Sequence, residues 1–276
     1  MRARRQKRVE YAPIDPTQIH RRDLSHYPVG SMRRLRIVTL NCLYLSRPRA
    51  RLRVIGRLLK EMAPDVTCLQ EVFFRRNVPL LDDDRAVFRP GGLGVAGGLV
   101  TLADGPVDSW RFEPFRTTVW FELLARKGFL MTRLRLGGEP VTVVNTHLLA
   151  NYSENWDLDN YYARRQLEEL GQLATAIRQL PGEELAIVAG DFNVPANSPQ
   201  FRDFMSDCGL FSAVDWSVFP VGGHGIREID NVLYRPPLGR RMSGSARLCF
   251  DGQIELAGGR KVFPSDHVGV EAVLEW

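Results

Sequence analysis

The sequence predicts an α/β domain whose buried strands carry polar side chains at their ends. Residues 185–189 form an apolar run of strand length, and Gly190, Asp191 and Asn193 follow it directly. Amphipathic helical stretches stand between several of the strand-like runs, so the chain combines helices with strands. A Gly137-Gly138 turn between two strand-like runs predicts a hairpin, so antiparallel neighbours are also expected. The 276 residues suffice for one large domain.

Composition and cysteine usage narrow the class of protein. The sequence has no apolar run of the about eighteen residues that a membrane-spanning helix needs. Its first residues are basic and lead into Val9 and Glu10 rather than an apolar core, so we expect no secretory signal peptide and a cytoplasmic protein. The four cysteines stand far apart without a Cys-x-x-Cys pair, which predicts reduced core residues rather than disulfides or a zinc site.

The basic residues concentrate at the N-terminus. Residues 1–36 contain ten Lys or Arg and three acidic residues. The rest of the chain therefore contains 27 basic and 29 acidic residues. We expect residues 1–31 to be an extended, solvated basic arm, which is also suited to contact anionic lipid or nucleic acid. Residues 32–276 are predicted to form a single domain.

The first elements follow from local pattern. A β-branched strand over residues 36–40 leads into Asn41. The apolar residues of 50–62 recur at spacings of three and four, which predicts an amphipathic helix that Pro64 ends. A second short strand ends in Gln70-Glu71. Two neighbouring strands therefore deliver polar side chains at their ends.

The middle of the chain is predicted to be strand-rich. Strands are expected at residues 99–102, 119–124, 129–136 and 141–148, the last of which carries His147 at its end. The aromatic and amide-rich loop 151–162 follows and is the expected wall of a binding site. A helix with apolar residues from 167 to 177 then runs to Pro181.

The central strand and the C-terminal part complete the candidate site. In an extended segment Asp191 and Asn193 would point the same way and bring a carboxylate and an amide donor into one volume. Ser198-Pro199 predicts the start of a helix that runs to Cys208. Asp230 lies in an apolar strand over 227–234, where an unpaired carboxylate is costly, and His267, ahead of the last strand at 268–274, is its expected partner.

Six short motifs in this order resemble the endonuclease/exonuclease/phosphatase superfamily. They are Asn41 after a β run, Gln70-Glu71, Asn145-Thr146-His147, Gly190-Asp191-Phe192-Asn193, Ile229-Asp230-Asn231-Val232-Leu233-Tyr234 and Ser265-Asp266-His267. The resemblance implies a four-layer α/β sandwich, with two mixed β-sheets face to face and helices outside. It also implies hydrolysis of phosphodiesters or phosphomonoesters with Mg²⁺, for which Mn²⁺ is an expected substitute.

The resemblance also implies roles for single residues. Glu71 is the expected direct Mg²⁺ ligand, Asn41 is expected to support the metal or a phosphate oxygen, and Asp266 is expected close to the metal. A hard cation of this kind is suited to one or two carboxylates plus waters.

The catalytic group implied by the resemblance has five members. Asp191 would orient or deprotonate the attacking water, and Asn193 would donate to the phosphoryl oxygens. His147 would stabilise the phosphate or protonate the leaving group. Asp230 would hold His267, a second candidate for the base, and the sequence leaves open whether Asp191 or His267 takes the proton.

Within the superfamily the histidine-bearing motif and residues 127–130 and 145–152 are most similar to the neutral sphingomyelinase and DNase I-like branches. This predicts a monomeric phospholipid headgroup hydrolase with peripheral membrane contact, in which Asn41, Asn151, Tyr152 and Trp156 contact substrate. A DNase I-like endonuclease, a phosphatase acting on another phosphoester and a non-catalytic scaffold are the alternatives. The excess of acidic residues after Arg36 is unfavourable for a nuclease, although the basic arm could compensate.

Overall fold

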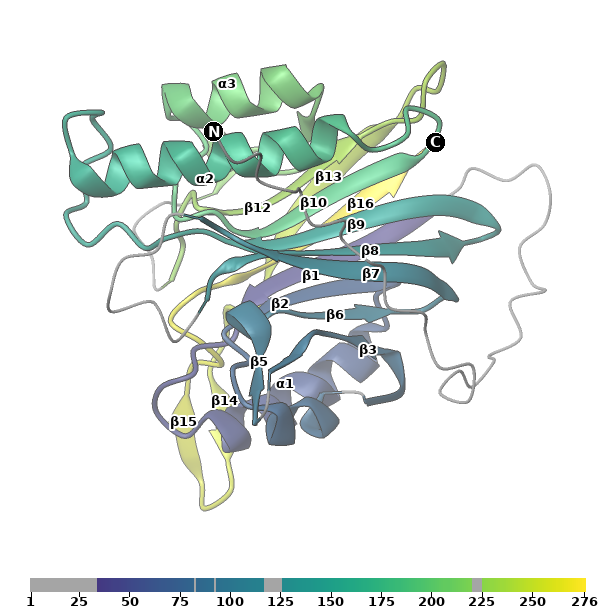
Figure 1. The fold of residues 1–276 in the computed structure, drawn as a ribbon. Helices are drawn as coiled ribbons and strands as arrows, with labels where there is room; N and C mark the ends of the chain where they lie inside the picture. The colour runs from purple at the N-terminus through teal and green to yellow at the C-terminus, as the bar shows by residue number, and fades with distance from the viewer. Residues whose placement is uncertain (1–33, 82, 92, 117–125, 220–224) are drawn as a thin grey trace, which may run out of the picture.

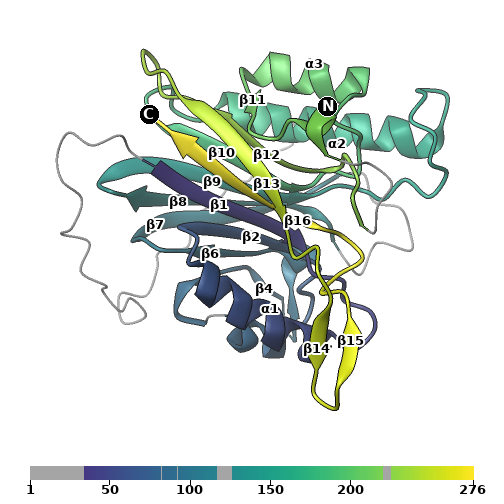
Figure 2. The same ribbon diagram turned by 180° about the vertical axis from the view of Figure 1, so that it is seen from behind.

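Two mixed β-sheets lie face to face with helices on both outer sides in a computed structural model of the chain (Figure 1). The structure describes residues 34–276 except 82, 92, 117–125 and 220–224. The opposite view shows the same four layers, with α1 (Pro48–Met62) on one outer face and α2 (Tyr161–Arg178) and α3 (Pro199–Cys208) on the other (Figure 2). The expected four-layer sandwich is confirmed. The arm 1–31 and the strand expected at 119–124 lie outside the described residues.

The first sheet has the strand order β13-β16-β1-β2-β6-β3. Its strands are β1 (Arg34–Asn41), β2 (Val66–Gln70), β3 (Ala86–Val87), β6 (Val100–Ala103), β13 (Ser243–Cys249) and β16 (Gly269–Glu275). β1 and β2 are parallel, and the other pairs in this sheet are antiparallel.

The second sheet has the order β11-β12-β10-β9-β8-β7. Its strands are β7 (Val107–Pro114), β8 (Gly128–Leu136), β9 (Glu139–His147), β10 (Leu185–Asp191), β11 (Phe211–Ser212) and β12 (Asp230–Arg235). β9 and β10 are parallel, and β8 and β9 form the predicted antiparallel hairpin. Two small hairpins, β4–β5 (Pro90–Gly91 and Gly94–Val95) and β14–β15 (Ile254–Leu256 and Arg260–Val262), complete the strands.

Three apolar layers hold the sandwich together. Side chains of both sheets, including Ile37, Val143 and Ile187, meet in the central layer. The predicted apolar face of α1 packs on the outside of the first sheet, and α2 and α3 pack on the outside of the second. The four cysteines are buried free thiols, as predicted. Among the described residues, no helix has the length and apolar character needed to cross a membrane.

The helix boundaries follow the predicted signals. Pro48 opens α1, and Ala63 in a left-handed conformation closes it just before Pro64. The side chain of Ser198 accepts from the Phe201 backbone N–H at the start of α3, as an N-cap residue does. Short 3-10 turns lie at Arg75–Leu80, Asp83–Arg85, Ala96–Gly98 and Trp216–Val218.

Gly190 lets the two central parallel strands approach closely. Its φ is +149°, and a Cβ added there would lie 2.0 Å from the backbone oxygen of Thr146. Only glycine fits this contact between β9 and β10. The close approach aligns Asp191 with His147 across the two strands.

Candidate active site

The ends of β1, β2, β9 and β10 and the start of β12 bring the predicted site residues together. Asn41 ends β1 beside the end of β2, and Asp191 ends β10 opposite His147 of β9 and Asp230 of β12. Parallel strands place their carboxyl ends at the same edge of a sheet, so residues far apart in sequence converge here. Glu71 follows β2 directly and joins them.

Asn41 connects the two carboxylates of the site. Its buried amide Nδ2 donates to Glu71 Oε1 at 3.2 Å and to Asp191 Oδ2 at 3.0 Å. Two carboxylates that share one amide group present oxygens to a common volume, which is the donor set that a hard divalent cation prefers. Asn41 Oδ1 accepts from the Leu43 N–H at 3.1 Å, so the Asn41 amide positions the two carboxylates, and the chemistry of Glu71 fits the Mg²⁺ ligand role expected for it.

Glu71 is held in an unusual backbone conformation. Its φ is +62°, in the left-handed region that favours glycine, and its Oε2 accepts from the Tyr44 backbone N–H at 3.0 Å. A non-glycine residue here stores strain that the surrounding structure must offset. A Cβ on Gly98 would lie 3.2 Å from Glu71 Cα, so Gly98 packs closely against the backbone of this turn.

Asp191 is the centre of the site. Its Oδ2 lies 3.4 Å from His147 Nε2 and 3.9 Å from His267 Nε2, in addition to its contact with Asn41. Burial raises the pKa of this carboxyl, but the two imidazoles and Lys127 outweigh burial and hold its pKa below the ordinary value. Asp191 is therefore an ionised acceptor at neutral pH.

His267 and Asp230 form the pair that the sequence predicts. His267 Nδ1 donates to Asp230 Oδ2 at 2.8 Å, and both side chains are buried. Burial opposes the charged imidazole, but Asp230 and then Asp191 outweigh it and raise the pKa of His267 to about 10. Burial also raises the pKa of Asp230 to about 6, against the opposing effect of His267. Both partners are thus charged between these two pKa values.

His147 differs from His267 in its charge. Burial, followed by the nearby Lys127, lowers the pKa of His147 to about 3, so its imidazole is neutral at physiological pH. A neutral imidazole has one N–H to donate and no spare proton for a leaving group. Of the two roles expected for His147, only stabilisation of the phosphate fits this state.

Asn193 does not point as an extended segment predicts. β10 ends at Asp191, and Asn193 has a left-handed φ of +51°. Its backbone N–H donates to Asp191 Oδ1 at 2.9 Å, and its Nδ2 donates to the Leu148 carbonyl at 3.1 Å. The expectation that the Asp191 and Asn193 side chains point the same way was wrong. The turn after β10 directs the Asn193 side chain toward Leu148, which follows β9.

Loop 151–160 has an anchored part and an exposed part. The indole Nε1 of the half-buried Trp156 donates to the Asn193 carbonyl at 3.1 Å, and the ring packs on the layer below α2 and α3. Asn151 accepts from Ser153 and donates to the Asn155 carbonyl, so its side-chain amide makes its hydrogen bonds within the loop. Tyr152 is 64% exposed. Trp156 and Asn151 thus shape the loop, and Tyr152, which packs edge-on against Tyr162, is the exposed candidate for substrate contact.

Asp266 directly precedes His267 of the pair. It is exposed and hydrogen-bonds Ser265. Among the described residues, the side chains whose ligand atoms lie within 4.8 Å of one another are Asp191, Asp230 and His267, without Asp266. The expectation that Asp266 lies close to the metal stays a prediction.

Buried amides that sequence reasoning did not assign a role support the site. Asn145 of β9 donates to the carbonyls of Leu69 and Val100 in the other sheet, at 3.2 and 3.0 Å, and accepts from Gln70 at 2.9 Å. Gln70 and Asn145 thereby tie the two sheets together beneath the site. Both residues belong to sequence motifs, Gln70-Glu71 and Asn145-Thr146-His147, and these motifs were the available sign of their importance.

The buried face of α2 also holds the strand ends. Gln166 donates to the carbonyls of Leu149 and Asn193, at 2.8 and 2.7 Å, and Glu169 accepts from the Leu149 N–H at 2.8 Å. In the sequence, the sign of this contact was the presence of two polar residues, Gln166 and Glu169, among the leucines of one helix face.

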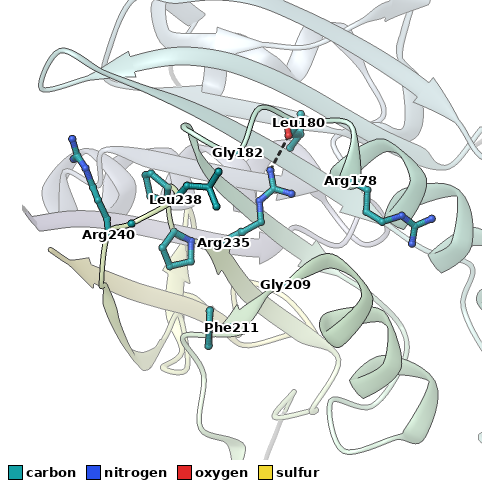
Figure 3. Close-up of a pocket in the computed structure, with 11 residues that line it drawn as sticks. Arg178, Leu180, Gly182, Gly209, Phe211, Arg235, Leu238 and Arg240 are labelled. Atoms are coloured by element: carbon teal, nitrogen blue, oxygen red, sulfur yellow. Dashed lines mark hydrogen bonds between the residues drawn. The ribbon is translucent and has the colours of Figure 1, made fainter.

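A shallow pocket opens at the opposite end of the second sheet. Arg235, at the far end of β12 from Asp230, lies at its centre and donates to the Leu180 carbonyl (Figure 3). Leu238 and Phe211 line the same pocket. Because β12 separates this pocket from the Asp230 end, it is no part of the candidate active site.

Two mixed sheets place carboxylates and histidines together at adjoining strand ends. The sequence profile of the Endonuclease/Exonuclease/phosphatase family matches residues 38–267, and the chain belongs to this family. Enzymes of the family generally depend on a divalent metal ion, and the buried acidic and histidine cluster fits this requirement.

Comparisons with individual proteins agree with the family. The chain is 26% identical over 230 residues to a putative neutral sphingomyelinase of Drosophila melanogaster, covering 75% of this chain and 50% of that protein. It is 24% identical over 115 residues to a phospholipase C of Staphylococcus aureus, covering 41% and 34%. The matches thus span half or less of these relatives.

Solved structures share the fold. The crystal structure of SmcL superposes with a TM-score of 0.70 at 17% identity, covering 87% of this chain and 98% of that one. D. rerio TDP2 in complex with a single-strand DNA product gives a TM-score of 0.67 at 17% identity, covering 87% and 98%.

Proposed function

We propose that this protein is a Mg²⁺-dependent phosphodiesterase that hydrolyses the headgroup phosphodiester of a phospholipid of the sphingomyelin type. The observation that carries the proposal is the environment of Asp191. One buried, ionised carboxylate lies within 4 Å of an amide and two imidazoles of different charge. An acceptor for a water proton and donors for a phosphate thus face the same volume, as an in-line displacement requires.

The metal would be held by Glu71, and Asn41 would support it by positioning the Glu71 and Asp191 carboxylates. When bound, Mg²⁺ would polarise the phosphoryl group and offset the charge that develops on it. The Tyr44 N–H that fixes Glu71 keeps this carboxylate oriented toward Asn41. Mn²⁺ takes oxygen ligands of the same kind and is the expected substitute.

The protonation states assign the proton transfers within this proposal. Asp191 is ionised and accepts a proton from water, whereas His267 carries a proton on Nε2 that it can donate to the leaving oxygen. Asp230 keeps His267 charged, and neutral His147 donates one hydrogen bond to the phosphate. Asn193 contributes by fixing Asp191 through its backbone N–H.

The names of the relatives and the exposed side chains support a lipid substrate. Tyr152, Leu158 and Tyr161 are 64%, 48% and 47% exposed at the loop beside His147. Such amphipathic and apolar side chains settle at the boundary between headgroups and acyl chains. Peripheral contact of a cytoplasmic monomer with a membrane surface is part of the proposal.

A panel of substrates tests the function. The full chain is incubated with Mg²⁺ and with sphingomyelin vesicles, lysophospholipid, plasmid DNA or inositol phosphates, with Asp191→Asn and chelator as controls. Release of the phosphorylated headgroup, absent in both controls, is the expected result. Metal-dependent hydrolysis of DNA alone would refute the lipid assignment.

A nuclease is the second candidate, and the basic residues up to and including Arg36 favour it. Ten cations in this segment could retain a polyanion through phosphate contacts. Plasmid cleavage that disappears when residues 1–31 are deleted would favour this candidate over lipid hydrolysis.

A further inference from the structure

Four apolar side chains lie exposed on the segments next to Glu71, and the proposed reaction uses none of them. Tyr44, Leu45, Phe74 and Leu93 are 41%, 55%, 42% and 91% exposed, and together they are called the apolar rim here. Leu93 lies at the turn of the β4–β5 hairpin, between Gly91 and Gly94. A leucine exposed almost completely at a turn gains nothing from the fold, and several such residues together indicate an interaction surface.

The rim is attached directly to the candidate metal ligand. The Tyr44 N–H donates to Glu71 Oε2 at 3.0 Å, and the Tyr44 ring packs edge-on against Phe73 with 5.2 Å between centroids. Phe74 forms a β-bridge with Gly94 in the hairpin that carries Leu93. A body that contacts the rim therefore lies against the entrance to the site.

The segments that carry the apolar rim are themselves basic. The rim segments, residues 43–49, 73–81 and 89–98, contain five arginines and no acidic residue. Arg49 donates to the Arg76 carbonyl and to Asn77 Oδ1, at 3.3 and 3.2 Å, which joins the segment after β1 to the segment after β2. The Arg75 N–H donates to the Leu93 carbonyl at 3.1 Å, which adds the hairpin. The three segments thus form one connected surface.

We propose that the apolar rim and its arginines dock this enzyme on a bilayer that contains anionic phospholipid, with Leu93 entering the headgroup region. Aliphatic Leu45 and Leu93 can enter lipid but have no ring face on which a nucleic-acid base could stack. The arginines complement anionic headgroups. This inference rests on the proposed phospholipid hydrolase function, and it adds a second contact surface to the one at Tyr152.

The two surfaces fit a single docked orientation. The rim follows β1 and β2 of the first sheet, whereas loop 151–160 follows β9 of the second sheet. The site lies between the ends of these strands, so exposed apolar side chains flank it on both sides. Docking through both surfaces would turn Glu71 and Asp191 toward the membrane.

Leu93→Glu tests the proposal, with Leu238→Glu as the matched control. Leu238 is 81% exposed and lines the pocket at the far end of the second sheet (Figure 3). Both substitutions are made in the full-length Asp191→Asn protein, so that binding is measured without hydrolysis. Binding to phosphatidylcholine vesicles with and without phosphatidylglycerol is measured by flotation, and unfolding midpoints verify the fold of each variant.

Leu93→Glu is expected to weaken binding to anionic vesicles by about tenfold or more, because burial of one leucine in lipid is lost. Leu238→Glu is expected to bind as the parent does. Arg75→Gln should weaken binding by about fivefold on anionic vesicles and leave binding to neutral vesicles unchanged.

The proposal is overturned if Leu93→Glu binds vesicles as the parent does, or if Leu93→Glu and Leu238→Glu lose binding equally. It is also overturned if Leu93→Glu retains single-stranded DNA less well but binds vesicles unchanged. Its failure is separable from failure of the proposed function. If the protein hydrolyses the headgroup but Leu93→Glu binds vesicles unchanged, only the proposed docking surface is refuted. Leu93-dependent vesicle binding by a protein that cleaves no lipid removes only the function.

Discussion

Replacing Asp230 with asparagine preserves the shape of the side chain and removes its charge. The amide oxygen can still accept from His267 Nδ1, which now lies 2.8 Å from the carboxylate. Without the carboxylate the largest effect that opposes burial is lost and only Asp191 and Asp266 still favour the charged imidazole, so the pKa of His267 falls from its value of about 10 and a smaller fraction of the imidazole is charged. Loss of a positioned general acid costs about 10²- to 10⁴-fold in rate, or roughly 3–5 kcal/mol in barrier height.

The pH dependence separates this mechanism from simple damage. In the wild type, activity should rise as Asp230 ionises near pH 6 and should fall as His267 loses its proton near pH 10, because the reaction needs both charged. Asp230→Asn should lack the acid limb, and its alkaline limb should move to lower pH. Hydrolysis of a soluble phosphodiester is measured across this range, with the exposed Asp251→Asn as control. A wild-type profile in Asp230→Asn, with activity reduced only in proportion to the unfolded fraction, would refute the reasoning.

Three further outcomes are expected from the same structure. Glu71→Gln should abolish most Mg²⁺-dependent activity, since an amide binds a hard cation weakly, while the unfolding midpoint stays near that of the wild type; full activity at saturating Mg²⁺ would exclude Glu71 as the ligand. Gly190→Ala should lower the free energy of unfolding by about 3 kcal/mol in urea titrations, because its Cβ would lie 2.0 Å from the Thr146 carbonyl oxygen. Asn145→Ala should cost roughly 3–5 kcal/mol of unfolding free energy, since it leaves two carbonyls and the Gln70 amide buried without this partner; a loss below about 1 kcal/mol would mean that water replaces the amide.

The strands and helices that could be predicted share one property, which is a strong local pattern. The buried runs of β1, β2 and β10 and the apolar stripe of α1 are visible in the sequence because each buries a regular set of positions. β7 was missed because it is an edge strand that is mostly half-buried, so polar and apolar residues mix along it. β13 was missed for the same reason, since it is the edge strand of the first sheet and exposed positions alternate along it.

The sequence by itself determined which residues stand at the strand ends, because a strand's length and burial depend on nearby residues and the motifs fix their order. Only the tertiary structure decided what those side chains contact. The left-handed turns at Glu71 and Asn193 direct one side chain toward Asn41 and the other toward Leu148. Such turns depend on partners more than twenty residues away, such as Gly98 beneath Glu71, and no local pattern contains this information. The opposite charge states of the two histidines have the same origin, because a pKa is set by the charges and burial that folding assembles around the ring.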